Sequence, residues 1–152
     1  MAVDSVINFG ASALALGSCP INPGWVLEGN PVARNALLSV SADGTASSYI
    51  WDCTAGRFNW FYNVDETIYV IEGGVVLKDT RGVHRLSAGD AIFFPAGSNA
   101  EWIIETYIRK FAVIRTPLPR PLVAAKRGYK FLKRLVGVGN GKAAGPAMFE
   151  SG

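Results

Sequence analysis

The sequence predicts one small all-β barrel followed by a C-terminal helix, and three observations support this fold class. Two stretches, 59–73 and 86–97, combine runs of β-branched and aromatic residues with glycine corners, as strands and tight turns do. The 17 glycines and 8 prolines among 152 residues exceed the usual share of about 12% and favour many short strands. Strand signals also recur at the spacing of about 8–12 residues that is typical of sandwiches and barrels.

The N-terminal third predicts the first barrel strands after a poorly patterned arm over 1–19. This arm either lacks order or packs on a partner subunit. The barrel domain is expected over 20–117. Its first elements are a turn with a short edge strand over 21–29, strands over 34–41 and 47–53, and a turn at 54–56.

The middle of the chain predicts the rest of the barrel. Phe58, Trp60 and Tyr62 share one face of a strand, because side chains alternate along a strand. Gly73-Gly74 and the segment 80–82 are expected to be hairpin turns. The remaining strands are expected over 67–71, 75–79, 83–86, 91–94, 100–105 and 107–115.

Two spaced motifs carry a family resemblance. Glu66 is followed after six residues by Gly73, and Gly89 is followed after five residues by Pro95 and then Gly97. These spacings resemble the two motifs of the cupin superfamily. The resemblance implies a cupin-type double-stranded β-helix, or jelly-roll barrel, which commonly pairs into a homodimer.

Within the superfamily, the chain looks most like the small single-domain cupins grouped with ureidoglycine aminohydrolase, of the DUF861 or Cupin_3 type. The residues that carry this likeness are Trp60, Asp65, Glu66, Arg109 and Lys110, and the similarity covers about 20–116. Cupins include isomerases, dioxygenases, decarboxylases, storage proteins and sugar-binding regulators, so the fold alone does not name an activity.

The segment 118–152 differs from the barrel in charge and pattern. It holds seven Lys and Arg against one acidic residue, whereas 1–117 holds eight against eleven. After the proline-rich segment 117–121, an amphipathic helix is expected around 122–136, and 137–152 is expected to be disordered. The helix could dock on the barrel or a sister subunit, or could contact an anionic surface or an acidic partner. Nucleic acid is not expected as a partner.

The resemblance also implies a metal site, which the residues present do not support. Metal-dependent cupins place a His-x-His pair, a Glu and a third His at the barrel mouth. Here only Glu66 matches. Trp60 and Tyr62, or Asn59 and Phe61 with the longer spacing, fall at the paired positions, and Ala100 falls at the third. The single histidine, His84, lies outside both motifs and is interpreted as a surface or edge residue. We therefore predict no metal and no other cofactor.

The predicted site is an aromatic box with one carboxylate. Phe58, Trp60, Tyr62, Glu66 and Trp102 are the candidate ligand-binding residues, and Glu66 with Tyr62 are the candidate catalytic residues. Aromatic faces beside one anion suit a small polar or sugar-like metabolite. The alternative is that these rings are only the barrel core and that Glu66 holds a turn.

Two function classes remain open. The favoured one is a metal-free, small-molecule-binding or sensor protein; the alternative is an aminohydrolase-like or isomerase-like enzyme that uses Glu66 and Tyr62, with or without an unusually bound divalent metal. Cys19 and Cys53 are not expected to pair, and the first residues do not resemble an export signal, so a cytoplasmic location is predicted.

Overall fold

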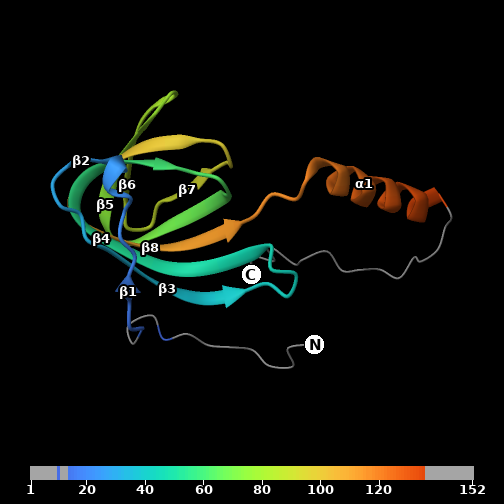
Figure 1. The fold of residues 1–152 in the computed structure, drawn as a ribbon, viewed down its shortest axis with the longest axis horizontal. Coiled ribbons are helices and arrows are strands. Elements are labelled where there is room, and N and C mark those ends of the chain that lie inside the picture. Colours follow the sequence, from blue (N-terminus) through green and yellow to red (C-terminus); the bar gives the residue numbers. More distant parts are fainter. Residues whose placement is uncertain (1–9, 11–13, 136–152) are drawn as a thin grey trace, which may run out of the picture. The chain divides into compact units, whose positions relative to one another are not determined.

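The computed structural model describes residue 10 and residues 14–135 of the chain. The described part is almost entirely antiparallel β-structure, as predicted (Figure 1). Its elements are β1 (Gly17–Ser18), a 3-10 turn (Pro23–Trp25), β2 (Val26–Glu28), β3 (Ala33–Val40), β4 (Ala46–Phe61), β5 (Asp65–Asp79), β6 (Gly82–Ser87), β7 (Ala91–Phe94), β8 (Asn99–Arg115) and α1 (Arg120–Leu135).

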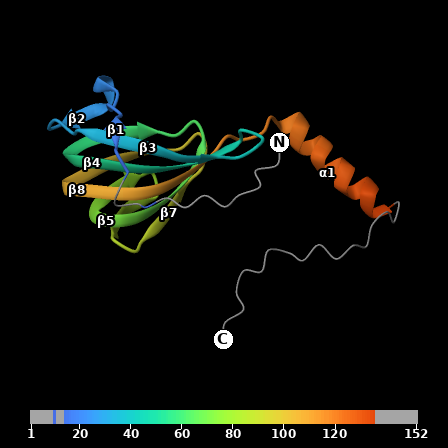
Figure 2. The same ribbon diagram turned by 90° about the horizontal axis from the view of Figure 1, so that it is seen from below.

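Three long strands, β4, β5 and β8, form the frame of the barrel. Strand β8 lies between β4 and β5 along most of its length, and Figure 2 shows β3, β4, β8 and β5 in succession. The first half of β4 pairs with β3 and its second half with β2, while β5 pairs first with β7 and then with β6. Each long strand therefore contributes to both sheets of a jelly roll, which confirms the predicted fold class.

The predicted hairpin turn at Gly73-Gly74 is wrong, because β5 continues through it. Pairing with β8 is interrupted between Gly73 and Val76, so these glycines lie in a bulge that bends the strand from one sheet into the other. Gly73 has φ 73°, and a Cβ on it would lie 2.0 Å from the carbonyl oxygen of Tyr107. The glycine pair that predicted a turn instead allows β5 to bend without ending.

The predicted turn at 54–56 is a second bulge. Strand β4 runs without a break from Ala46 to Phe61, and its register against β8 shifts between Thr54 and Gly56. The predicted break between 105 and 107 is absent for the same reason, since β8 also continues through the bend. Small residues at these positions let long strands bend where a barrel needs corners.

The space between the two sheets is filled by a continuous hydrophobic core. Phe58, Ile68 and Ile108 are completely buried, and Trp102 is 1% exposed. The rings of Phe58 and Trp102 stack with centroids 6.0 Å apart, and Phe94 stacks on Tyr62 at 4.2 Å. Aromatic packing between β4, β7 and β8 is therefore a main part of the core.

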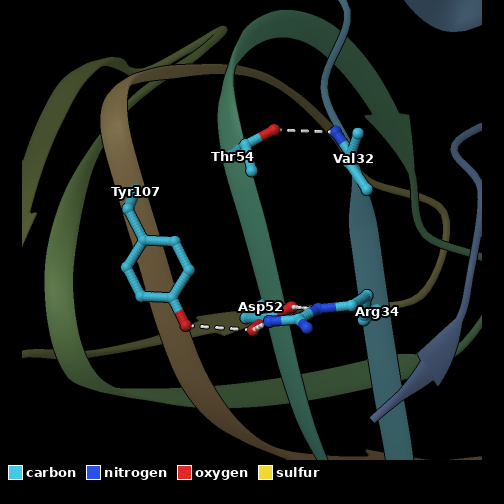
Figure 3. A network of polar contacts seen from close by, with 5 residues as sticks. All are labelled: Val32, Arg34, Asp52, Thr54 and Tyr107. Carbon is cyan, nitrogen blue, oxygen red and sulfur yellow. Dashed lines mark hydrogen bonds and ion pairs between the residues drawn. The ribbon is translucent and has the colours of Figure 1, made fainter.

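A polar network fixes β3 against β4 and β8, as Figure 3 shows. The buried carboxylate of Asp52 accepts a hydrogen bond from Arg34 Nε at 3.0 Å and one from the Tyr107 hydroxyl at 3.0 Å. Nearby, the amide of Val32 donates to Thr54 Oγ1 at 2.9 Å. Because a buried carboxylate needs partners, this network holds Arg34 and Tyr107 in place.

The chain divides into two compact units between Pro117 and Leu118. The second unit contains α1. Its first residue lies two positions before the predicted start at 122, and its last residue lies one position before the predicted end at 136. The predicted disordered end lies outside the described residues, as does most of the predicted arm. Among the described residues, no helix is long and apolar enough to cross a membrane.

Candidate functional site

An ion pair inside the barrel is the centre of the candidate site. Lys110 Nζ, from β8, donates to Glu66 Oε1, from β5, at 2.7 Å. The side chains are only 6% and 7% exposed. Lys110 lies opposite Val70 and Glu66 lies opposite Ile114, with the small Ala112 between them on β8, so the lysine chain has room to extend toward the carboxylate.

Two indole rings surround the lysine ammonium. Lys110 Nζ lies 4.8 Å from the ring centroid of Trp51 and 4.8 Å from that of Trp102. Both distances are in the range of cation–π attraction, which strengthens when the cation is shielded from water. The ammonium is thus stabilised by one carboxylate and two aromatic faces, which offsets part of the cost of burying it.

A cavity of about 240 Å³ adjoins this ion pair. Trp51 and Trp60 provide aromatic surface, and Glu66 and Lys110 provide the charged groups. The other residues that line it are Cys19, Asn35, Tyr49, Ala112 and Ile114. The cavity therefore combines indole faces, an ion pair and several hydrogen-bonding groups, a composition typical of sites for small molecules.

The five predicted site residues occupy two different environments. Trp60 and Glu66 line the cavity. Phe58, Tyr62 and Trp102 are 0%, 3% and 1% exposed and belong to the hydrophobic core behind it. Trp60 touches this core through an edge-to-face contact with Phe58. Trp60 and Glu66 thus face the cavity, whereas Phe58, Tyr62 and Trp102 support it from the core. Contact of these three rings with a ligand stays a prediction.

Tyr62 is engaged with Trp102 in the structure. Its hydroxyl oxygen accepts a hydrogen bond from Trp102 Nε1 at 3.0 Å. Burial, with a smaller contribution from the negative charge of Glu66, raises the pKa of the Tyr62 phenol well above its usual value. The phenol therefore stays protonated at neutral pH.

The donor set does not fit a divalent metal ion. Of the positions that the resemblance assigns to metal ligands, only Glu66 and Tyr62 carry oxygen groups. Glu66 already binds the Lys110 ammonium, and the Tyr62 phenol has a raised pKa and accepts a hydrogen bond from Trp102. Trp60 and Ala100, which pair across β4 and β8, offer no donor for a metal. In residue 10 and residues 14–135, no three His, Cys, Asp or Glu side chains lie close enough to share a metal ion.

The partner of Glu66 in the structure is Lys110. Arg57, another possible partner, instead donates from Nε to Glu101 Oε1 at 2.6 Å. The alternation of faces along β8 indicated that Arg109 and Lys110 could not both point inward, but it did not say which one does. The structure decides this: apart from Thr106 at the bend, the even-numbered residues of β8 from Ala100 to Ala112 are buried, so Lys110 faces the core.

Sequence reasoning did not identify Cys19, Asn35, Tyr49 and Trp51 as cavity residues. Asn35 and Tyr49 belong to strands before the first cupin motif. Cys19 follows β1, and its amide donates to the carbonyl of Ala33 at 2.9 Å. The alternation that put Tyr49 and Trp51 on one strand face was the only available signal, and it did not tell which face points inward.

His84 lies on β6 and is paired with Asp79 at 3.4 Å. Its side chain is 40% exposed, and it does not line the cavity beside Glu66. This agrees with its interpretation as a surface or edge residue.

Comparisons with known proteins agree with the architecture. The family of EutQ-like cupin domains matches residues 40–112. No curated protein matches the chain. Among solved structures, a DUF861-family protein from Pseudomonas syringae is 26% identical with a TM-score of 0.62, over 67% of this chain and 45% of that one. The chain therefore spans less than half the length of that protein.

Two further structures resemble the chain in fold. The EutQ protein of Clostridium difficile is 24% identical with a TM-score of 0.51, over 57% of this chain and 69% of that one. KdgF from a Halomonas species is 13% identical with a TM-score of 0.56, over 75% and 96%.

Proposed function

The chain belongs to the cupin superfamily, in its EutQ-like DUF861 group, and on this basis we propose that it binds a small metabolite without a metal ion. The observation that carries the proposal is the buried Glu66–Lys110 ion pair at the wall of a cavity lined by indole rings. The Lys110 ammonium already neutralises the Glu66 carboxylate, which is the role that a metal cation would otherwise have.

The cavity indicates the chemistry of the ligand. Its volume, about 240 Å³, is below the roughly 300–1,000 Å³ of sites for drug-sized ligands. Indole faces of Trp51 and Trp60 suit the apolar face of a sugar-like ring, and Asn35 and Tyr49 supply polar groups for its hydroxyls. We place this protein in a reducing, cytoplasmic setting, which the unpaired thiols of Cys19 and Cys53 favour.

The experiment is a binding titration of the full chain with a panel of monosaccharides and sugar acids. Binding is monitored through tryptophan fluorescence, with and without a chelator. We expect saturable binding that the chelator leaves unchanged. Trp60→Ala should abolish this binding. Phe61→Ala is the matched control, because Phe61 is the next residue on β4, is half-exposed and does not line the cavity. Binding that requires added metal would contradict the proposal.

A second candidate is an aminohydrolase-like or isomerase-like enzyme with Glu66 as the proton-transferring group. The position of Glu66 in the cavity wall favours it, because a carboxylate there can take a proton from a bound substrate, with the Lys110 ammonium beside it. Tyr62, the other predicted catalytic residue, does not line the cavity, so this candidate function depends on Glu66. Glu66→Gln should abolish turnover while the barrel stays folded; unchanged turnover would remove Glu66 from the mechanism.

A further inference from the structure

Helix α1 has two chemically distinct halves. Successive residues of an α-helix are about 100° apart, so Leu122, Tyr129 and Leu132 lie on one half of the helix surface. Arg127, Lys130 and Lys133 lie on the other half. No acidic residue occurs anywhere in Arg120–Leu135. The helix is therefore amphipathic, with a polar half that carries only positive charge.

The apolar half of α1 carries large side chains that are exposed within its unit. Leu122, Tyr129, Phe131 and Leu132 are 56%, 65%, 64% and 59% exposed. By the same angular count, Phe131 lies at the border between the two halves, opposite Leu122. Such a group of large apolar side chains, bordered by cations, is a feature of surfaces that bind a partner.

The helix by itself is only marginally stable. A helix of 16 residues is near the lower limit for stability in water, and Gly128 near its middle lowers its stability further. Crowded positive charges on one half lower it further. A surface that covers the apolar half and neutralises the cations would stabilise the helix.

We infer that α1 binds the surface of an anionic lipid bilayer and lies in the plane of that surface. The apolar residues span about half of the helix circumference, whereas a helix that packs along one protein partner needs only a narrow stripe. A flat bilayer interface accepts the wide apolar half, and its acidic headgroups attract the cations. The aromatic rings of Tyr129 and Phe131 suit the headgroup boundary.

The charge distribution of the chain favours an anionic surface over a neutral one. Residues 118–152 have seven basic residues and one acidic residue, whereas residues 1–117 have eight basic and eleven acidic residues. On balance, acidic headgroups therefore attract residues 118–152 and repel residues 1–117. If α1 packed on the barrel instead, its apolar half would not be available to a bilayer, and the chain would not bind vesicles.

The experiment is co-sedimentation of the full chain with phosphatidylcholine vesicles, with or without phosphatidylglycerol. We expect binding only to the vesicles with phosphatidylglycerol, weaker at high salt because exposed charges are then screened. Addition of these vesicles should also increase the helical circular dichroism signal. Failure of the chain to sediment with the anionic vesicles at low salt would overturn the inference.

Charge variants test whether α1 carries the binding. Lys130→Glu with Lys133→Glu should weaken binding at least about 30-fold, since each cation near an anionic surface accounts for about fivefold in affinity. The matched control is Lys78→Glu with Arg85→Glu, which makes the same change in net charge at exposed positions of β5 and β6. Equal losses in both double variants would show that overall charge, and not α1, is responsible and would overturn the inference.

An apolar variant tests the other half of the helix. Leu132→Ser leaves the charge unchanged and should weaken binding about tenfold or more, because a buried leucine contributes ~2 kcal/mol. Unchanged binding would mean that the apolar half does not enter the bilayer and would also overturn the inference. Thermal unfolding of the barrel should be the same in all variants, so a loss of binding is not a loss of the barrel fold.

Discussion

Lys110 and Glu66 form an ion pair across neighbouring strands although they are not opposite each other in register. Lys110 lies opposite Val70, and Glu66 lies opposite Ile114, yet Nζ and Oε1 are 2.7 Å apart. The lysine side chain extends along the sheet past Ala112. This offset places both charges at the cavity and leaves the ammonium between two indole rings.

The ion pair should be necessary for stability as well as for the site. Lys110→Met leaves the Glu66 carboxylate buried without its cation, so we expect the free energy of unfolding in urea to fall by about 3–5 kcal/mol. Adding Glu66→Gln should recover part of this loss, because the unpaired charge is then gone. Arg115→Met is the control, since its pair with Asp65 is exposed and should contribute at most about 1 kcal/mol. Equal costs for Lys110→Met and Arg115→Met would contradict the prediction.

Tyr62 should make the barrel sensitive to alkali. Its pKa is raised in the folded state, so above the ordinary value of 10.0 the unfolded chain loses the phenolic proton while the folded chain keeps it. The unfolded state then binds fewer protons, and stability decreases as pH rises above about 10. Tyr62→Phe should reduce this decrease, which urea unfolding at several pH values measures. The same variant should cost about 1–3 kcal/mol at neutral pH, because it leaves Trp102 Nε1 without an acceptor.

An equally steep alkaline decrease in Tyr62→Phe would exclude Tyr62 as its source. Tyr107→Phe provides a comparison, since the pKa of that phenol is also raised, mainly by burial and by its hydrogen bond to Asp52, although it is less buried than Tyr62.

The two thiols should differ in reactivity. Cys53 is completely buried, and burial raises the pKa of its thiol to about 12, so it has almost no reactive thiolate at pH 8. Cys19 is half-buried and lines the cavity. A thiol reagent should therefore modify one cysteine in the native chain and the second only in denaturant. Cys19→Ser should remove the native reaction, and faster labelling of Cys53 than of Cys19 would be the contrary outcome.

Gly73 should be intolerant of a side chain. A Cβ at this position would overlap the carbonyl oxygen of Tyr107, and the positive φ is itself unfavourable for alanine. We expect Gly73→Ala to lower the free energy of unfolding by more than about 3 kcal/mol. Gly44→Ala is the control, since Gly44 has φ 68° but has no atom near its Cβ position and should cost only about 1–2 kcal/mol. A similar cost at both positions would mean that the bulge can open to admit a methyl group.

The sequence alone determined the fold class, because the evidence for it is local. Turn residues such as Gly89 and Pro95, with a short run of apolar residues between them, indicate a barrel strand without any knowledge of distant contacts. The absence of histidine at positions 60, 62 and 100 is also evident from the sequence alone. The amphipathic pattern of α1 likewise depends only on neighbours within the helix.

Only the tertiary structure decided what Glu66 does and which residues join it. The bulges at Gly73 and beside Gly56 resemble turns in the sequence, because glycine serves both, yet they keep the strands continuous and reset which side chains face inward. Glu66 and Lys110 share the inward face of one continuously paired stretch of β5 and β8, and Trp51 lies opposite Lys110 on β4. Phe58, Tyr62 and Trp102 remain in the core. Strand alternation gives relative faces only, and the absolute facing of a strand depends on partners that are far away in the sequence.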